Sequence, residues 1–425
     1  MIYIPSRMGQ LNRRALLRQL QKLGIASRAD LAKSLGMSQP TAGKIVDELL
    51  ELDVVEEVDA PPAGSRDAAG NGADTVVRGR PGRLLRLNQS SAKLLGIQLG
   101  VNETTVAGLS LGIMDRDEWH YTFSIDHTQE DPAKAWELQL RRAAKAIAGD
   151  RFLGVLLSAP GVVDETGNRV LFSPNIHWTE KADLVGIVKR IWKAPALLVQ
   201  EERVLALGYH LANPDCEDFL LVDFGEGVGG AIVVNGKPLA NPLPLSGEIG
   251  HTPALGNHRR CGCGALGCVE TLVSVRGLLE SFTAANPRLP NSWASLSAHI
   301  ARQGIEPWLA QALDAAAVAI AGALNVLGLR QVVITGSLTE LPPAVLAHLS
   351  RAIENGAMWA RFGKVECIAS PRRRTAGLVA VGIDRLVVPD RQDNDGAASF
   401  ARLPQPTNSK ISRRQPAAPK VKILQ

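Results

Sequence analysis

The chain has 425 residues, too many for one hydrophobic core, and its 45% hydrophobic and 21% charged residues are ordinary for a globular protein, so we expect two or three domains. The net charge of +5 says little about nucleic acid, because residues 391–425 carry seven Lys or Arg against two Asp and match the whole excess. Five cysteines and no apolar signal segment exclude a disulfide framework and a secretory signal, so we expect a cytoplasmic protein that does not bind a membrane.

Residues 12–58 predict a small helical unit with a strand at its end. A leucine stripe at 16, 17, 20 and 23 indicates a helix that ends at Gly24. Ser27 and Asp30 form a capping box for a second helix, Arg28–Leu35, and Ser38 caps a third, from about Gln39 to Leu52. Two short helices joined by a glycine turn are typical of a helix-turn-helix, whose second helix enters the major groove of DNA. The alternative is a helical hairpin that serves packing only.

The candidate DNA contacts lie in this unit. Ser38, Gln39, Thr41 and Lys44 begin the predicted recognition helix. Strands at Asp53–Val58 and Arg83–Leu87 would form a wing around a flexible insertion at 59–78, which is rich in Gly, Ala, Pro and Asp. Arg80 and Arg83 could reach a minor groove or belong to a solvated basic loop. Residues 1–90 are therefore expected to be a winged helix-turn-helix domain that binds double-stranded DNA.

From Leu94 to about Val388, apolar β-type segments alternate with helical ones, which predicts an α/β architecture. The expected strands are Leu94–Val101, Thr104–Ile113, Phe152–Leu157, Ala196–Val199, Phe219–Asp223, Ala231–Val234 and Gln331–Thr335, and the expected helices are Pro132–Ile147, Glu202–Leu211 and Trp308–Leu327. Glycine-rich turns after two of these strands suggest two lobes that face a cleft. The polar, aperiodic residues 391–425 are expected to be a disordered basic tail.

The most specific segment runs from Ser246 to Glu270. It holds His251, Cys261, Cys263 and Cys268, and three thiolates with one imidazole make a closed tetrahedral set for zinc. We expect a structural metal that positions polar groups for a neighbouring ligand. Free or disulfide-bonded cysteines are the alternative.

Taken together, these motifs resemble the ROK family of sugar kinases and sugar-responsive repressors over about residues 10–388. The matching segments are SRADLAKSLGMSQPTAGKIVDEL, GRPGRLLRLN, LLGIQLG, SAPGVVDETGN, SPNIHW, GEGVGGAIVVNG, SGEIGH and CGCGALGCVE. The resemblance implies a two-lobed actin/hexokinase-like (ribonuclease H-like) effector domain over residues 91–390, with structural zinc at the His and three Cys. The N-terminal extension is similar to that of the repressor branch.

Three positions depart from the family's kinase pattern. Gln98 stands where sugar-phosphorylating members have an Asp that helps to hold Mg²⁺, and Glu226 stands inside a phosphate turn that is usually Gly-Thr-Gly. Glu201 replaces the Asp of the family's catalytic Asn-Asp pair, and its extra methylene would misplace the carboxylate. A kinase needs these groups to position metal and phosphate. We therefore expect no catalysis and no ATP.

The sugar side of the pattern is better preserved. By the resemblance, the sugar-binding residues would be Gly161, Asn175, Glu201, Glu248, His251 and Glu270. Convergent carboxylates, an amide and an imidazole suit a polyol ligand. The alternative is a degenerate pocket whose residues serve structure only.

The sequence therefore predicts a transcriptional regulator, most simply a repressor, of carbohydrate metabolism or uptake genes. A sugar or sugar phosphate would control it, and it would bind its operator as a homodimer or a dimer of dimers. Two rivals remain: an ATP-dependent sugar kinase of the ROK family, and a regulator that has no small-molecule effector.

Overall fold

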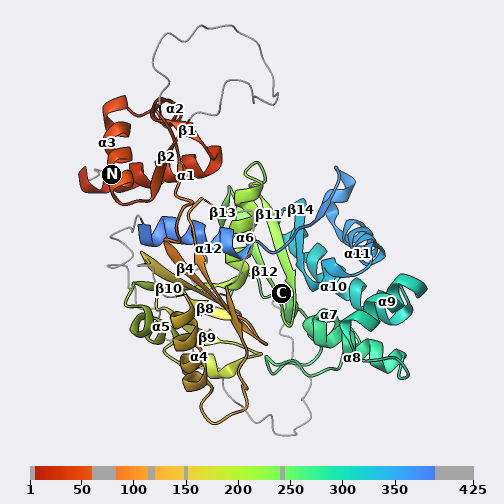
Figure 1. The fold of residues 1–425 in the computed structure, drawn as a ribbon. Helices are drawn as coiled ribbons and strands as arrows, with labels where there is room; N and C mark the ends of the chain where they lie inside the picture. The colour runs from red at the N-terminus through yellow and green to blue at the C-terminus, as the bar shows by residue number, and fades with distance from the viewer. Residues whose placement is uncertain (1–4, 60–82, 113–119, 148–151, 240–244, 388–425) are drawn as a thin grey trace, which may run out of the picture. The chain divides into compact units, whose positions relative to one another are not determined.

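The computed structural model describes residues 5–59, 83–112, 120–147, 152–239 and 245–387 (Figure 1). Some expectations fall on the remaining residues. The insertion expected at 59–78 lies outside the described residues except for its first position, and Arg80 and the tail at 391–425 lie outside them entirely.

The N-terminal unit consists of three helices and a small sheet. The helices are α1 (Pro5–Leu23), α2 (Arg28–Ser34) and α3 (Gln39–Glu51), and the strands β1 (Ala26–Ser27), β2 (Val55–Val58) and β3 (Leu84–Leu87) pair in the order β1-β3-β2. Leu16, Leu17 and Leu20 of α1 are fully buried and share one cluster with Leu31 of α2 and Val46 of α3. The prediction that Leu23 belongs to the buried stripe is wrong, because it is 46% exposed at the end of the helix. The expected antiparallel pairing of β2 with β3 is confirmed.

Side-chain caps set the helix boundaries in this unit. The Ser27 hydroxyl accepts from the Asp30 N–H at 3.1 Å and the Asp30 carboxylate accepts from the Ser27 N–H at 3.2 Å, which confirms the capping box. Ser38 caps α3 by accepting from the Thr41 N–H at 3.3 Å. The prediction that Asp53 belongs to the wing strand is wrong, because its φ of +56° places it in a left-handed turn after α3.

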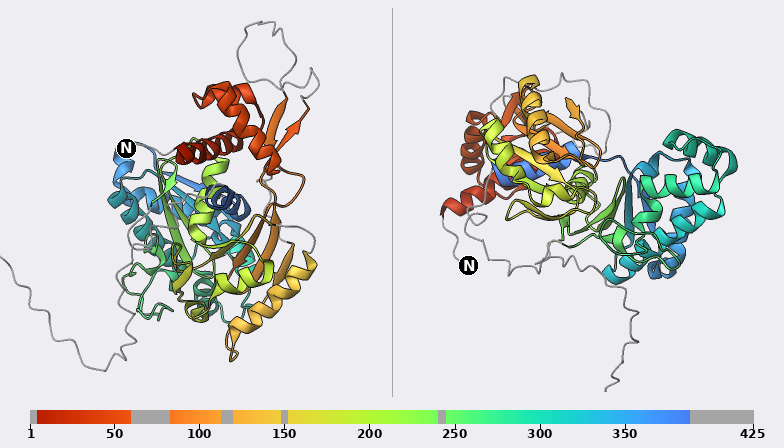
Figure 2. Two further views of the ribbon diagram at one scale, coloured as in Figure 1. Left: turned by 90° about the vertical axis from the view of Figure 1, so that its left-hand side faces the viewer. Right: turned by 90° about the horizontal axis from the view of Figure 1, so that it is seen from below.

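Two five-stranded sheets with the same strand order form the rest of the α/β fold (Figure 2). The first lobe has the order β10-β7-β4-β5-β6, with β4 (Leu94–Leu99), β5 (Thr104–Leu109), β6 (Tyr121–Phe123), β7 (Gly154–Ala159) and β10 (Ala196–Gln200). The second has β13-β12-β11-β14-β15, with β11 (Phe219–Phe224), β12 (Val228–Val234), β13 (Lys237–Pro238), β14 (Gln331–Gly336) and β15 (Glu366–Ala369). In each lobe an antiparallel meander continues into two parallel strands.

Shorter elements connect and cover these sheets. A separate ribbon pairs β8 (Val162–Asp164) with β9 (Arg169–Phe172), and α4 (Pro132–Ala146) and α5 (Leu184–Trp192) pack in the core of the first lobe. The second lobe adds α7 (Glu270–Val273), α8 (Val275–Ala285), α9 (Trp293–Gln303), α10 (Pro307–Leu327) and α11 (Pro343–Gly356). The 3₁₀ helices are η1 (His177–Glu180), η2 (Ile249–His251), η3 (Ser337–Glu340) and η4 (Met358–Arg361).

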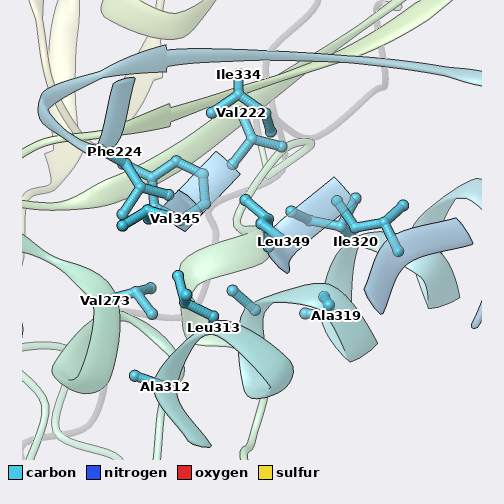
Figure 3. Close-up of a cluster of buried hydrophobic side chains, with 14 of the residues drawn as sticks. Val222, Phe224, Val273, Ala312, Leu313, Ala319, Ile320, Ile334, Val345 and Leu349 are labelled. Atoms are coloured by element: carbon cyan, nitrogen blue, oxygen red, sulfur yellow. The ribbon is translucent and has the colours of Figure 1, made fainter. Parts of the chain in front are cut away.

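The core of the second lobe lies between its sheet and helices α10 and α11 (Figure 3). Leu313 and Ile320 of α10 meet Leu349 of α11 below Val222 and Ile334 of the sheet, and each large aliphatic side chain buried there contributes about 1.5–3 kcal/mol. By length and composition α10 could also cross a membrane, but half of its apolar window is buried within this fold, as is usual for a core helix.

Two helices cross between the sheets and join the lobes. Helix α6 (Glu201–Ala212) packs against the second sheet, whereas α12 (Arg374–Gly382) packs against the first and continues into the π-helix η5 (Ile383–Val387). Glycines allow the two backbones to approach closely. A Cβ on Gly208 would lie 2.0 Å from the carbonyl oxygen of Arg373, and one on Gly377 would lie 1.9 Å from that of Val204.

Candidate functional site

Residues from both lobes line a cavity of about 440 Å³. The first lobe contributes the end of β4, the turn at Pro160, the loop after β9 and the start of α6. The second contributes the β11–β12 turn and the segment Ser246–Glu270, here called the metal-ligand loop after its candidate ligands. The structure brings all six predicted sugar-binding residues to this cavity: Gly161, Asn175, Glu201, Glu248, His251 and Glu270. Gln98 and Glu226, two of the departures from the kinase pattern, line it as well.

Asn175 and Glu270 meet at the glycine turn between β11 and β12. A Cβ on Gly227 would lie 3.2 Å from the Asn175 amide nitrogen and 3.1 Å from a Glu270 carboxylate oxygen. The same Glu270 oxygen accepts from the Val228 N–H at 2.9 Å, and Glu270 is only 4% exposed. This bond fixes one oxygen of Glu270, so its carboxylate is held beside the cavity in a defined orientation.

Glu248 and His251 lie at either end of η2. The Nε2 atom of His251 is 3.7 Å from a Glu248 oxygen, while its Nδ1 atom faces Cys261. Burial, and then the charge of Glu270, raise the pKa of Glu248 to about 7. Near neutral pH this carboxyl can therefore either donate a hydrogen bond or accept one.

His251, Cys261, Cys263 and Cys268 form a compact donor set, with all four ligand atoms within 4.8 Å of one another. The Cys263 and Cys268 sulfurs are 3.7 Å apart, and the Cys261 sulfur is 3.6 Å from Nδ1 of His251. A tetrahedral ion with bonds of about 2.3 Å to sulfur and about 2.0 Å to nitrogen requires edges of about 3.5–3.8 Å. The donor set could therefore hold such an ion.

Burial favours the neutral thiols of this cluster. It raises the pKa of Cys268 to about 11 and that of Cys261 far above its usual range. A metal ion that binds thiolates must therefore displace protons, and its affinity must increase with pH.

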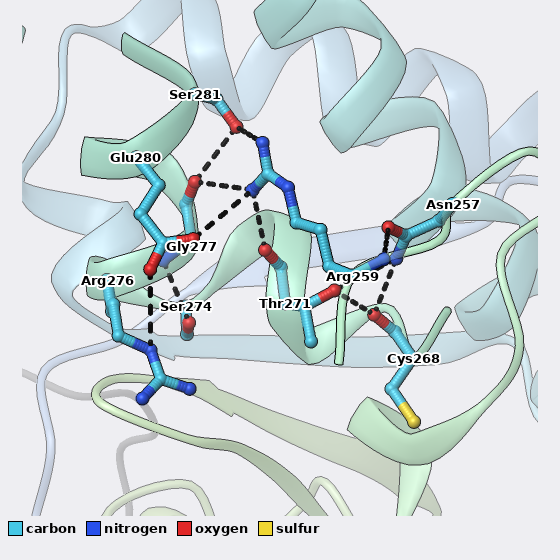
Figure 4. A network of polar contacts seen from close by, with 9 residues as sticks. All are labelled: Asn257, Arg259, Cys268, Thr271, Ser274, Arg276, Gly277, Glu280 and Ser281. Carbon is cyan, nitrogen blue, oxygen red and sulfur yellow. Dashed lines mark hydrogen bonds and ion pairs between the residues drawn. The ribbon is translucent and has the colours of Figure 1, made fainter. Parts of the chain in front are cut away.

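A polar network braces the metal-ligand loop against α7 and α8 (Figure 4). The Arg259 guanidinium donates to the carbonyl oxygens of Thr271 and Gly277 at 2.8 and 3.1 Å and to the Ser281 hydroxyl at 2.8 Å. The Asn257 side chain donates to the Cys268 carbonyl at 3.0 Å. These hydrogen bonds hold the loop through the side chains of Arg259 and Asn257, and the backbone of Cys268 takes part in them.

The same loop touches the first lobe near the cavity. A Cβ on Gly262 would lie 2.5 Å from the carbonyl oxygen of Pro174, the residue before Asn175. Only glycine fits at this approach. The loop that carries the donor set therefore packs directly against the loop that carries Asn175.

Sequence reasoning missed five charged residues at this cavity: Glu103, Glu202, Asp223, Arg372 and Arg374. Arg372 donates to both carboxylate oxygens of Asp223, at 2.7 and 2.8 Å. Burial opposes ionisation of Asp223, but Arg372 outweighs it and holds the pKa of Asp223 below its usual value. The sequence does contain one hint of these charges, the run Arg372-Arg373-Arg374 before an Ala- and Gly-rich helix. The acidic partners of this run are more than 100 residues away in sequence, so the pairing could not be predicted.

Glu201 and Glu202 occupy the first turn of α6. Glu201 pairs with Arg374 through one oxygen, and its Oε2 atom is buried without a hydrogen-bond partner. Glu202 lies against Gly229 of β12, and its Oε2 atom is buried and unpartnered in the same way. Burial, followed by the charges of neighbouring carboxylates, raises the pKa of Glu202 well above its usual value.

The predicted DNA contacts form a second group, at the start of α3. Ser38, Gln39, Thr41 and Lys44 are all exposed there, although Ser38 is engaged in the cap and its hydroxyl lies 2.7 Å from that of Thr41. Arg83 is 75% exposed and pairs with Glu57 on the adjacent strand. Arg80 lies outside the described residues.

Comparisons with known proteins agree on one family. The sequence model of the ROK family matches residues 94–382. The DNA-binding transcriptional dual regulator NagC of Escherichia coli K12 is 25% identical over 371 residues, which cover 82% of this chain and 86% of NagC. The xylose repressor of Bacillus subtilis is 22% identical over 387 residues, or 89% of this chain and 95% of the repressor.

Solved structures show the same actin-like fold. A ROK family transcriptional regulator, a homologue of the E. coli MLC protein, has a TM-score of 0.69 and 21% identity over 89% of this chain and 97% of its own. A ROK family glucokinase from Streptomyces griseus, in complex with glucose and AMPPNP, has a TM-score of 0.55 and 21% identity over 68% of this chain and 97% of the glucokinase.

Proposed function

The chain belongs to the ROK family, and from that premise we propose that it is a cytoplasmic, sugar-responsive transcriptional repressor. Its N-terminal unit would bind operator DNA of genes for carbohydrate metabolism or uptake, and its interlobe cavity would bind a sugar effector. The similarity to NagC and to the xylose repressor over more than four-fifths of the chain supports this assignment.

The N-terminal unit would act as a winged helix-turn-helix, here called the reading unit (residues 5–59 and 83–90). Gly36, with a φ of +62°, turns the chain between α2 and α3. The exposed side chains of Gln39, Thr41 and Lys44 at the start of α3 would then meet base edges or phosphates in the major groove. A homodimer or dimer of dimers would present two such units to a palindromic operator.

The effector would bind in the cavity through Asn175, Glu201, Glu248, His251 and Glu270, with Gly161 at its floor. This set offers an amide, an imidazole and several carboxyls, which together can donate to and accept from the hydroxyls of a polyol. Zinc is the natural occupant of the neighbouring donor set, because three thiolates and one imidazole are its preferred structural ligands. The ion would orient His251 and brace the loop without taking part in chemistry.

Catalysis is not part of the proposal. Gln98 and Glu226 place an amide and a carboxylate where a kinase would need a metal-binding Asp and an uncharged phosphate turn. Glu201, the position of the family's base, has one of its oxygens engaged by Arg374. ATP-dependent phosphorylation of any hexose at an enzymatic rate would overturn this part.

Contacts at the end of α12 supply a route from the cavity to the reading unit. The Asp384 carboxylate in η5 accepts from Arg18 of α1 at 2.9 Å. The next residue, Arg385, donates to Glu165 at 3.2 Å, and Glu165 accepts from the backbone N–H of Gln200 beside the cavity at 3.2 Å. A change of the angle between the lobes on effector binding would therefore move η5, which contacts α1.

One observation carries the proposal: six residues expected to bind sugar come from separate segments of both lobes and line one cavity in a chain that also has an exposed helix start. The test combines two measurements on the full chain. A sugar should raise the melting temperature of the wild type but not of Glu248→Ala, and the same sugar should weaken a sequence-specific gel shift. Absence of any sequence-specific shift would refute the repressor assignment.

A further inference from the structure

The cavity is strongly acidic. Among the residues that the structure describes, seven acidic ones line it, against two arginines and no lysine: Glu103, Glu201, Glu202, Asp223, Glu226, Glu248 and Glu270. This imbalance matters for a ligand, because a confined site with low-dielectric walls strengthens the field of its charged groups. The imbalance would disfavour any ligand that carries a phosphate or a carboxylate.

Both arginines are already committed to acidic partners. Arg372 makes two hydrogen bonds to Asp223 and a third, at 3.3 Å, to the carbonyl oxygen of Phe224. Arg374 pairs with Glu201. Within the described residues, no Lys or Arg lies within ion-pair distance of the other five acidic groups, so the cavity offers an anion little uncompensated positive charge.

The first turn of α6 supplies a second, independent observation. Glu201 is 6% exposed and lines the cavity, and its Oε2 atom has no hydrogen-bond partner. The Oε2 atom of Glu202, on the same turn, is buried and unpartnered too. Buried polar atoms are normally satisfied, so the first turn of α6 carries acceptor capacity that no protein donor meets. A phosphate group above pH 7 carries almost no hydrogen-bond donors.

We propose, on the basis of the function assigned above, that the effector is an unphosphorylated sugar, that a free amino sugar is the best-matched class, and that Glu202 sets this preference. An ammonium group brings three donors and a positive charge to this acidic lining. A sugar hydroxyl brings one donor and no charge. A sugar phosphate brings a negative charge to a cavity lined by acidic side chains, which disfavours its binding.

The test is isothermal titration of the full chain with matched triplets. Glucose, mannose and galactose would each be compared with its 2-amino and its 6-phosphate derivative. In the triplet that binds, we expect the amino sugar to bind at least tenfold more tightly than the parent sugar, and the phosphate at least tenfold more weakly. Raising the salt concentration should weaken binding of the amino sugar and strengthen that of the phosphate, since screening reduces both attraction and repulsion.

Glu202→Gln keeps the shape of the side chain and removes the carboxyl group that can ionise beside a bound ammonium group. We expect this variant to lose most of the amino-sugar preference while it still binds the parent sugar. Glu354→Gln is the matched control, because it makes the same substitution at an exposed position on α11, outside the cavity lining. A preference that survives in Glu202→Gln would overturn the role of this residue, and the wild-type titrations decide the ligand class even if the variant folds poorly.

The outcomes distinguish an error in the ligand class from an error in the proposed function. If the phosphate member binds as tightly as the parent sugar or more tightly, the ligand class is wrong but the proposed repressor function stands. If no member of any triplet binds while sequence-specific DNA binding persists, the sugar-effector part of the proposed function fails, and this inference fails with it.

Discussion

His251 is the residue at which the two halves of the candidate site meet. Its Nδ1 atom faces the thiol of Cys261 and its Nε2 atom faces Glu248, so one ring serves the donor set and the cavity at once. Glu270 has a similar double position, 3.6 Å from the Cys261 sulfur and hydrogen-bonded to the β11–β12 turn. A change in one cysteine should therefore reach the effector contacts without touching them directly.

Cys261→Ser tests this coupling. Because serine is a poor zinc ligand, we expect the variant to lose bound zinc, measured by elemental analysis, and to bind the effector at least tenfold more weakly. Operator affinity without effector should change by less than about threefold. Cys216→Ser, which changes a cysteine outside the donor set, is the control and should keep both zinc and response. A zinc-free Cys261→Ser protein with a normal response would contradict the bracing role.

Glu202 also predicts a dependence of stability on pH. Its folded-state pKa is raised mainly by burial, so the stability associated with its neutral form is complete below about pH 4.5 and is lost as the pH rises toward the folded-state pKa. Glu202→Gln removes this titration. We expect the variant to match the wild type at pH 4.5–5 and to exceed it at pH 8 by about 1–3 kcal/mol, in the range of an unsatisfied buried polar group. Chemical denaturation at both pH values measures this, and equal pH profiles for the two proteins would contradict it.

At the scale of elements, α12 and η5 connect the cavity to α1 of the reading unit. It begins at Arg374, which holds Glu201 at the cavity, and it leads into η5, where the carbonyl oxygen of Asp384 accepts from Arg14 at 2.8 Å and its carboxylate accepts from Arg18. The helix itself is buried against the first sheet. A rigid element with a contact to the effector site at one end and a contact to the reading unit at the other is suited to transmit a change between them.

Asp384→Asn should uncouple the two ends of this element. The variant loses the charge that holds Arg18, so we expect the ratio of operator affinities with and without effector to fall at least threefold, while effector affinity measured without DNA stays within twofold. Asp47→Asn is the control, because it breaks the Arg28–Asp47 ion pair inside the reading unit and leaves η5 intact. An Asp384→Asn protein with the full wild-type ratio would exclude this route.

Local signals in the sequence were enough to predict some elements and not others. The capping box at Ser27, the cap at Ser38 and the first three leucines of the α1 stripe depend on residues within a few positions of each other, and the structure has all of these. The glycine turn and the His and Cys spacing are similarly local. Asp223 with Arg372, by contrast, are 149 residues apart, and nothing in either neighbourhood indicates that two sheets would bring them together.

At the scale of the whole molecule, binding of operator DNA should depend on a few phosphate contacts and on base contacts from one helix in each reading unit. Lys44 is exposed and suits a phosphate, whereas Gln39, at the first position of α3, suits a base edge. The two side chains therefore predict different signatures in the same binding assay.

Lys44→Ala should weaken binding to all DNA sequences and should reduce the slope of log affinity against log salt by about one per contacting subunit. Gln39→Ala should lower affinity for the operator by about 1–3 kcal/mol with little effect on unrelated DNA. Lys145→Ala, on the exposed face of α4 in the first lobe, removes the same charge as a control. A salt slope unchanged in Lys44→Ala would exclude it as a phosphate contact.

The close crossing of α6 and α12 has a consequence for the kind of motion available to the lobes. With Gly208 and Gly377 each pressed against the opposite backbone, there is no side-chain layer along which the helices could slide, so relative movement should be a rotation about the crossing. A rotation displaces atoms in proportion to their distance from its axis. In the proposed dimer, the two reading units would then change their facing angle together with their separation, so an induced repressor would no longer match the phase of its half-sites on the DNA helix.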